Sequence, residues 1–386
     1  MSNRITSVDK LVNYTGLMLE EPETAQKAAS VFPMTVTPYY ASLIEKNNPQ
    51  CPIRLQCVPN PLELVESSCD MDDPLNEDAD SPVKGLTHRY PDRVLFLVTN
   101  ECSMYCRHCT RKRKIGDREK TIDNRQIERG LAYIRAHPEI RDVLISGGDP
   151  FILSDSKLEN IVRRIKIIPH VEVIRIGTRT PVVLPQRITG SLVNMLKKYQ
   201  PLWINTHFNH PREFTPESTK ALRKLVDAGI PIGNQSVLLK GVNDCSVIMR
   251  KLVHLLVQNR VRPYYLYQCD LSRGIDHFRT SIGKGIEIME SLIGHTSGFA
   301  IPRYVVDAPG GGGKIPLLPN YLLSMTGKKT VLRNYEGVIC VYEEPSDTEF
   351  KCPEGCHYCK TERNQKRSPV GLEKLVGPYC NTISMA

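Results

Sequence analysis

Three cysteines are the residues of this sequence with the clearest potential for chemistry. Cys102, Cys106 and Cys109 stand in the string CSMYCRHC, directly after the apolar run VLFLVT. Three thiolates at this spacing can hold three irons of a [4Fe–4S] cube, and without a fourth cysteine nearby one iron stays open to a chelating ligand. The alternatives are three corners of a zinc site or buried structural thiols. Because a structural zinc site needs four ligands, the spacing favours the cluster.

A glycine-rich loop that ends in a lysine is the second reactive feature. The sequence from Asp307 to Lys314 reads DAPGGGGK. It is not a P-loop, because Ala308 replaces the first glycine and Ile315 replaces the final Ser or Thr. Four glycines let a flat cofactor approach, and Lys314 could form an imine with the aldehyde of such a cofactor. A glycine-rich turn with a solvated lysine is the alternative.

Two arginines could complete a site for pyridoxal phosphate, which needs a phosphate pocket as well as a lysine. Arg89 and Arg93 stand in HRYPDR, just ahead of the first apolar run. Their guanidinium groups suit bidentate contacts with phosphate.

Six short apolar runs predict the scaffold that positions these residues. They alternate with amphipathic helical stretches and, after the first interval, recur about every 30 residues, the length of one strand, helix and return. This pattern predicts an α/β fold with a parallel sheet, either a partial (β/α)6 barrel or an open doubly wound sheet. The runs span residues 94–99, 143–147, 173–178, 202–208, 231–238 and 263–269, and the helical stretches span 125–136, 158–168, 191–199, 216–228, 246–257 and 285–293.

The placement of the reactive residues favours the barrel, because they follow the carboxyl ends of the predicted strands, where the active-site loops of such barrels lie. They are Cys102 after the first strand, Gly147, Gly148 and Asp149 after the second, His207 at the fourth, Gln235 in the fifth and Asp270 after the sixth.

We expect three parts along the chain. Residues 1–83 form a helical N-terminal region, residues 84–300 form the barrel, and residues 301–386 hold the lysine loop and a cysteine-rich extension. Residues 69–83 contain six carboxylates and two prolines, which is typical of a solvated connector.

The cysteine motif, together with the GGD string after the second strand, resembles the radical S-adenosylmethionine superfamily. In that superfamily the open iron binds the amino and carboxylate groups of the methionine part of the cofactor. The resemblance implies that the backbone of Gly147, Gly148 and Asp149 meets this amino group and that the ring of His108 packs on the adenine.

A longer set of motifs is similar to the lysine 2,3-aminomutase family. HRYPDRVLF, RTPVVLPQRIT, NTHFNHP, GNQSVLL, GVNDC, HFRT, GHTSG and VVDAPGGGGK follow the family's order and spacing over about residues 30–360. The roles that this resemblance implies are cofactor attachment for Lys314, phosphate binding for Arg89 and Arg93, cluster ligation for Cys102, Cys106 and Cys109, pairing with the substrate carboxylate for Arg111, and cofactor contacts for His207 and Gln235.

Two acids indicate the substrate. Asp270 and Asp307 occupy positions that bind the distal ammonium of lysine in this family, and glutamate-specific relatives replace such acids with Lys and Asn. A desolvated ammonium must be paired, which two carboxylates achieve. The resemblance therefore implies an isomerase that interconverts L-α-lysine and L-β-lysine by a radical 1,2-amino shift, using a 5′-deoxyadenosyl radical and a pyridoxal phosphate aldimine.

The sequence also allows other functions. Arginine is the close competitor of lysine as substrate, and glutamate or the supply of β-lysine for modifying elongation factor P are further alternatives. From a different class, two cysteine knuckles could form a zinc-dependent protein that binds nucleic acid.

A second cysteine triplet occurs late in the chain. Cys352, Cys356 and Cys359 stand in CPEGCHYC. In the family a C-terminal triplet joins a lone cysteine of the GVNDC segment, here Cys245, in a four-thiolate zinc site that often lies between subunits. The spacing differs from the family's common C-x-C-x2-C, which leaves an auxiliary Fe–S cluster as an alternative.

Composition sets the remaining expectations. The chain has 386 residues, of which 40% are hydrophobic and 24% charged, so intrinsic disorder is excluded. No apolar run approaches the roughly 18 residues that cross a bilayer, and the first residues lack an apolar signal core, so we expect a cytoplasmic protein whose 13 cysteines are reduced. The net charge of +9 is spread along the chain and does not indicate nucleic acid. The expected partners are an electron donor such as flavodoxin or ferredoxin and further copies of this chain.

Overall fold

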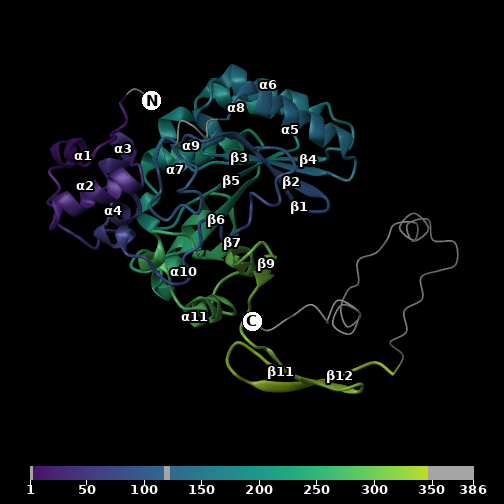
Figure 1. Ribbon diagram of the computed structural model, residues 1–386. Helices are drawn as coiled ribbons and strands as arrows, with labels where there is room; N and C mark the ends of the chain where they lie inside the picture. The colour runs from purple at the N-terminus through teal and green to yellow at the C-terminus, as the bar shows by residue number, and fades with distance from the viewer. Residues whose placement is uncertain (1–2, 117–121, 347–386) are drawn as a thin grey trace. The chain divides into compact units, whose positions relative to one another are not determined.

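The computed structural model describes residues 3–116 and 122–346 (Figure 1). The chain divides into two units, Met1–Pro319 and Asn320–Ala386. All residues considered for the active site lie in the first unit, apart from the C-terminal cysteine triplet, which lies outside the described residues.

The first unit is built around one mixed sheet whose strands follow chain order from β1 to β9. Strands β2 to β8 are parallel, and β1 and β9 add antiparallel edges. The backbone N–H of Lys314 in β9 donates to the Tyr90 hydroxyl of β1 at 3.0 Å, so the two edges meet and the sheet is nearly closed. The strands are β1 (Leu86–Tyr90), β2 (Arg93–Thr99), β3 (Asp142–Gly147), β4 (Val173–Gly177), β5 (Leu202–Thr206), β6 (Ile232–Leu238), β7 (Val261–Gln268), β8 (Arg303–Ala308) and β9 (Gly313–Pro316).

Amphipathic helices connect the parallel strands and lie outside them (Figure 1). In α6, for example, Leu158, Ile161 and Ile165 are buried, as the 3.6-residue period requires, and the Ser154 hydroxyl caps the first turn. No helix among the described residues is long and apolar enough to cross a bilayer. The connecting helices are α5 (Asn124–Ala136), α6 (Asp155–Lys166), α7 (Thr180–Val183), α8 (Gly190–Lys197), α9 (Pro216–Asp227), α10 (Ser246–Gln258) and α11 (Ile282–Leu292).

The N-terminal region is helical and belongs to the same unit as the barrel. Several of its helices begin at prolines, whose fixed φ suits the first turn. Leu11 and Tyr40 of this region pack in one hydrophobic core with Phe96 of β2. The elements are α1 (Val8–Thr15), α2 (Pro22–Val31), α3 (Pro38–Ala41), α4 (Pro52–Cys57) and the 3-10 helix η1 (Pro61–Leu64).

The α/β class and the partial barrel are confirmed, and all six predicted strands are present. The parallel series has a seventh strand, β8, and the first unit continues to Pro319, so the expected boundary at residue 300 falls inside the sheet. HRYPDR was placed ahead of the first strand but forms the β1–β2 hairpin. Short strands that border turns with Pro or Gly carry too little alternation to be recognised from sequence.

The expectation of a solvated connector at residues 69–83 is wrong. Glu77 is buried and pairs with Arg111, and Asp80 pairs with Arg89 at 2.7 Å. The backbone N–H of Met71 donates to the carbonyl of Leu271 in the loop after β7. The segment packs on the barrel because its carboxylates neutralise cations that would otherwise be buried without a counter-ion.

The second unit contributes a three-stranded antiparallel sheet. Its strands are β10 (Leu322–Met325), β11 (Lys329–Arg333) and β12 (Ile339–Glu343).

A buried group of charges joins the N-terminal region to the loop after β2 that carries Cys102, Cys106 and Cys109, which we call the cysteine loop. Glu63 accepts hydrogen bonds from Arg107 Nε at 2.8 Å and from Lys112 Nζ at 2.7 Å, and the three side chains are at most 7% exposed. Arg107 also donates to the carbonyls of Phe32 and Pro33. One carboxylate thus balances two buried cations.

Replacing Glu63 by Ala is expected to lower the free energy of unfolding by about 3–5 kcal/mol, because two cations lose their buried counter-ion. Urea denaturation of the protein without cofactors, followed by circular dichroism, measures the change. The matched control is Glu66→Ala, whose exposed pair with Arg273 is worth about 1 kcal/mol or less. Equal effects of the two variants would show that the Glu63 group does not stabilise the fold.

Candidate active site

The cysteine loop leaves the carboxyl end of β2 and is held by the N-terminal region. The backbone N–H of Tyr105 donates to the Thr35 carbonyl at 2.9 Å, and that of Arg107 donates to the Gln56 carbonyl at 3.0 Å. The path of the loop is therefore set by segments that precede the barrel in sequence.

Two glycines let the end of β3 touch the start of this loop. A Cβ at Gly147 would lie 2.1 Å from the Thr99 carbonyl oxygen, and one at Gly148 would lie 2.0 Å from that of Glu101. The backbone N–H groups of Gly148 and Asp149 donate to the same two carbonyls. Because a protonated amino group donates hydrogen bonds, its contacts with this turn would fall to backbone carbonyl oxygens.

The Asp149 carboxylate is buried and fully engaged by the protein. It accepts hydrogen bonds from the hydroxyls of Thr178 and Thr180 and from the backbone N–H groups of Phe151 and Arg179, at 2.6 to 3.0 Å. Even so, burial raises the pKa of Asp149 above its ordinary value. The side chain therefore joins the ends of β3 and β4.

The donors around the cysteine loop fit a bound cluster and a polar cofactor. Burial raises the pKa of Cys109 to about 11, with a contribution from Cys106, and burial also raises that of Cys102. Thiolates packed this closely need positive charge, which iron supplies. Buried polar atoms without a partner in the described part of the chain include Ser103 Oγ, His108 Nδ1, Asn205 Nδ2 and Thr206 Oγ1.

Within residues 3–116 and 122–346, no three Cys, His, Asp or Glu side chains converge on one metal ion. In a cube each thiolate binds a different iron, so its three sulfurs do not meet at one point.

Three further predicted residues lie beside the cysteine loop or inside the barrel. His108 lies within the loop, and its Nε2 is 3.3 Å from the amide nitrogen of Asn209. Burial lowers the pKa of His108 well below its usual range and that of His207, which follows β5, to about 3. Both rings are therefore neutral at physiological pH. Gln235 of β6 donates to the Tyr267 hydroxyl of β7.

Lys314 lies beside an acid and an aromatic ring. Its Nζ is 3.0 Å from Asp307 Oδ1, across the antiparallel pair of β8 and β9, and 5.2 Å from the centre of the Tyr267 ring. Gly313 at φ 82° brings the backbone against Tyr90, whose hydroxyl receives the Lys314 N–H. The lysine is thus presented on a strand edge rather than on a free loop.

Asp270 extends the acidic character of this region. Burial and the neighbouring Asp307 carboxylate raise the pKa of Asp270 to about 7, while Lys314 and Arg111 act in the opposite direction. The structure therefore places the two predicted acids, the lysine and the predicted carboxylate-binding arginine within electrostatic reach of one another.

Arg111 is held by Glu77 of the acidic segment. Its Nε and Nη2 donate to Glu77 Oε1 at 3.0 and 2.6 Å. Both contacts use one edge of the guanidinium, and within the described residues Nη1 has no hydrogen-bond partner.

The two predicted phosphate ligands differ in their surroundings. Arg89 is held by Asp80 and by the Leu75 carbonyl. Arg93 lies 3.8 Å from the centre of the Tyr90 ring, the same tyrosine that receives the Lys314 N–H. Its Nη1 donates to Asp92 at 2.9 Å.

The predicted zinc ligands lie in two separate parts of the chain. Cys245 is exposed just before α10. Cys352, Cys356 and Cys359 lie outside the described residues.

Sequence reasoning missed Glu77, Tyr90 and Arg179. Glu77 was hidden in an acidic run, and Tyr90 is part of a motif read only for its arginines. Arg179 donates to the Cys106 sulfur at 2.8 Å from the loop after β4, in the segment RTPVVLPQR. The position of an arginine directly after a predicted strand end was the available indication.

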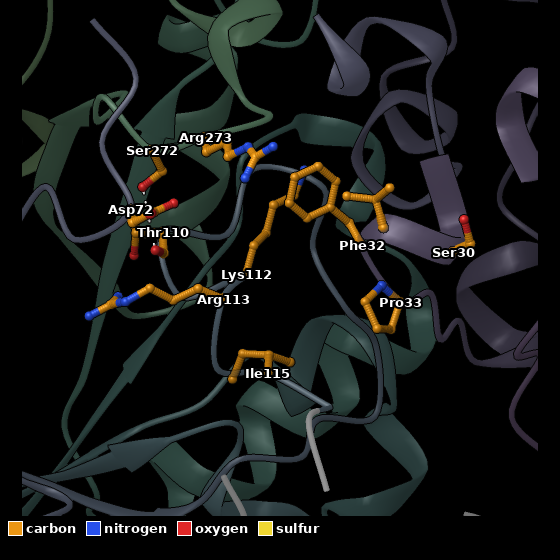
Figure 2. Close-up of a pocket in the computed structure, with 11 residues that line it drawn as sticks. Ser30, Phe32, Pro33, Asp72, Thr110, Lys112, Arg113, Ile115, Ser272 and Arg273 are labelled. Carbon is orange, nitrogen blue, oxygen red and sulfur yellow. Dashed lines mark hydrogen bonds between the residues drawn. The ribbon is translucent and has the colours of Figure 1, made fainter. Parts of the chain in front are cut away.

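A cavity of about 350 Å³ lies beside the outer part of the cysteine loop (Figure 2). It is lined by Thr110, Lys112 and Arg113 together with Phe32 and Arg273, and by none of the predicted cofactor or substrate ligands. Its cations pair with carboxylates, Lys112 with Glu63, Arg113 with Asp73 and Arg273 with Glu66. The reaction site is therefore expected inside the barrel.

Comparison with known proteins identifies the class of enzyme. The family model described as "Radical SAM superfamily" matches residues 96–252, which contain the last residues of β2, the cysteine loop, the GGD turn and strands β3 to β6. A radical SAM domain carries an iron–sulfur cluster and uses S-adenosylmethionine. A second model, described as "Lysine-2,3-aminomutase", matches residues 289–383.

Relatives aligned over nearly the full chain identify the family. The L-lysine 2,3-aminomutase of Methanococcus maripaludis is 58% identical, with 100% of this chain and 90% of the relative covered. That of Acetoanaerobium sticklandii is also 58% identical, with coverages of 99% and 91%. The glutamate 2,3-aminomutase of Clostridioides difficile is 48% identical, with coverages of 91% and 83%. This chain belongs to the lysine 2,3-aminomutase family and is an enzyme of the isomerase class.

Replacing Gly148 by Ala is expected to abolish stable cluster binding, because the new methyl group would collide with the Glu101 carbonyl and displace the cysteine loop. Iron and sulfide per chain after anaerobic reconstitution measure the loss. The control is Gly190→Ala at the start of α8, where no described atom outside the neighbouring backbone lies within 4 Å of the new Cβ. A Gly148→Ala protein that holds as much iron as the control would contradict this account of the turn.

Proposed function

We propose that the chain is an L-lysine 2,3-aminomutase that interconverts L-α-lysine and L-β-lysine. The observation that carries the proposal is the pair of carboxylates beside Lys314. Asp307 lies 3.0 Å from the lysine, and Asp270 is close enough for Asp307 to raise its pKa. Such a pair suits an added ammonium group and disfavours a second carboxylate, which is the difference between lysine and glutamate. The two L-lysine 2,3-aminomutases at 58% identity, against 48% for the glutamate enzyme, support the same choice.

Pyridoxal phosphate is proposed as the second cofactor. Lys314 would hold it, with Arg93 and Arg89 at its phosphate. When bound, the cluster with S-adenosylmethionine supplies an organic radical, and pyridoxal phosphate supplies the conjugated system that lets nitrogen migrate from C2 to C3.

The protein contributes binding, orientation and exclusion of water. The Nη1 edge of Arg111 is proposed to bind the substrate carboxylate, while Glu77 fixes the direction of the guanidinium. Asp270 and Asp307 would pair with the distal ammonium, so the two ends of lysine are fixed and C3 is held in one place. His108, His207, Gln235, Gly147, Gly148 and Asp149 are proposed to contact the cofactors.

Several further properties belong to this proposal. Cys245, Cys352, Cys356 and Cys359 are proposed to bind zinc. A flavodoxin or ferredoxin would supply the electron, and the chain would assemble as a homo-oligomer. The nine cysteines among the described residues are all free thiols, which supports a reducing, cytoplasmic setting.

The proposal is tested with anaerobic, iron-replete protein that receives pyridoxal phosphate, S-adenosylmethionine, a reductant and one amino acid. Lysine is expected to yield β-lysine, and arginine and glutamate are expected to react at least about 100-fold more slowly, because they mismatch the acid pair in size or charge. Mass spectrometry of derivatised products measures the rates. Faster reaction of glutamate or arginine than of lysine would refute the substrate assignment.

The kcat/KM for lysine is expected to depend on pH through Asp270, whose pKa is about 7 when no substrate is bound. The distal ammonium of lysine stays charged below about pH 10 and binds the ionised acid, so kcat/KM should fall about tenfold between pH 8 and pH 6. Initial rates across this range measure the profile.

Asp270→Asn should flatten the pH profile and raise KM, whereas Asp227→Asn, in an exposed pair with Arg260, should leave both unchanged. An unaltered profile in Asp270→Asn would show that another group titrates.

A further inference from the structure

Arg179 touches one of the three loop cysteines directly. Its Nη1 donates to the Cys106 sulfur at 2.8 Å, and the side chain is 8% exposed. The residue lies in the loop after β4, so this hydrogen bond joins two separate segments at the carboxyl end of the barrel.

Other contacts hold this guanidinium in place. Nε donates to the His207 carbonyl at 3.2 Å, and Nη2 donates to Glu213 Oε1 at 2.8 Å and to Gln56 Oε1 at 2.5 Å. The backbone N–H of Arg179 donates to the Asp149 carboxylate. With both ends held, the arginine cannot turn away from Cys106 without breaking several buried hydrogen bonds.

A cation that donates to a cluster sulfur changes the energy of the electron that the cluster accepts. The reduced cluster carries one more negative charge than the oxidised cluster, so a nearby guanidinium stabilises the reduced form more. Hydrogen bonds to the sulfurs are among the factors that set cluster potentials. The effect is strongest in a site closed to water, as here.

We propose that Arg179 is a positioning residue that orients Cys106 and raises the reduction potential of the cluster. Glu213, which is buried, opposes this effect because it shares the guanidinium and adds a negative charge. This inference rests on the proposed function, in which Cys102, Cys106 and Cys109 are the ligands of the iron–sulfur cluster.

The test is a reductive titration of the reconstituted proteins, followed by electron paramagnetic resonance, without S-adenosylmethionine. Arg179→Gln is expected to shift the midpoint potential to a more negative value at unchanged iron content, and Arg179→Lys to shift it less. Arg164→Gln is the control, because this arginine pairs with the exposed Glu128 on the surface and should leave the potential as in the wild type.

Glu213→Gln supplies an independent test if Arg179→Gln does not fold. This isosteric change removes the negative charge and is expected to move the potential in the opposite, positive direction. A potential equal to that of the wild type in Arg179→Gln, or a negative shift in Glu213→Gln, overturns the inference.

Two outcomes separate this inference from the proposed function. If the wild type forms β-lysine and holds its cluster while Arg179→Gln keeps the wild-type potential, only the inference fails. If Arg179→Gln loses affinity for S-adenosylmethionine in equilibrium dialysis at an unchanged potential, the guanidinium serves that cofactor instead, and the inference is again wrong. If the wild type binds no iron through its cysteine loop, the proposed function itself fails.

Discussion

The cysteine loop can pack inside the protein only because neighbouring carboxylates neutralise its cations. The loop carries five cations between residues 107 and 114, and taking such charges out of water costs several kcal/mol each unless they are paired. The N-terminal region supplies the counter-ions, chiefly Glu63 for Arg107 and Lys112, and Glu77 for Arg111. The first 83 residues are therefore part of the active-site structure, although they add no strand to the barrel.

The parallel sheet brings together residues that lie far apart in sequence. Its strand ends bring together the cysteine loop, the GGD turn, His207 and Asp270. The two sheet edges then meet through Tyr90, which receives the Lys314 N–H. The near closure of the barrel, and not the glycine loop alone, fixes the lysine beside its acids.

Much of this arrangement could be predicted from the sequence. The apolar runs predicted six strands because buried parallel strands are nearly continuous in hydrophobicity, and the helices between them kept a clear period. Strands β1, β8 and β9 were missed because they are short and border Pro91 or the glycine loop.

The pairing of the charges could not be predicted. An acidic run such as residues 69–83 has the same composition whether it is solvated or packed against cations, and only the fold shows that Glu77 reaches Arg111. Arg179 was missed for a related reason, since a buried arginine is recognised by its partners and not by its neighbours in sequence. The second cysteine triplet lies outside the described residues, so its ligand set remains a prediction from the family resemblance.

As an isomerase, the chain moves an amino group within one lysine molecule. The most direct test follows lysine labelled with ¹⁵N on its α-amino group, incubated anaerobically with the complete enzyme in the presence of unlabelled ammonia. Nuclear magnetic resonance of the product should show β-lysine with the full label on C3, because the nitrogen never leaves the enclosed site. Loss of the label to ammonia, or a product without nitrogen on C3, would contradict the account.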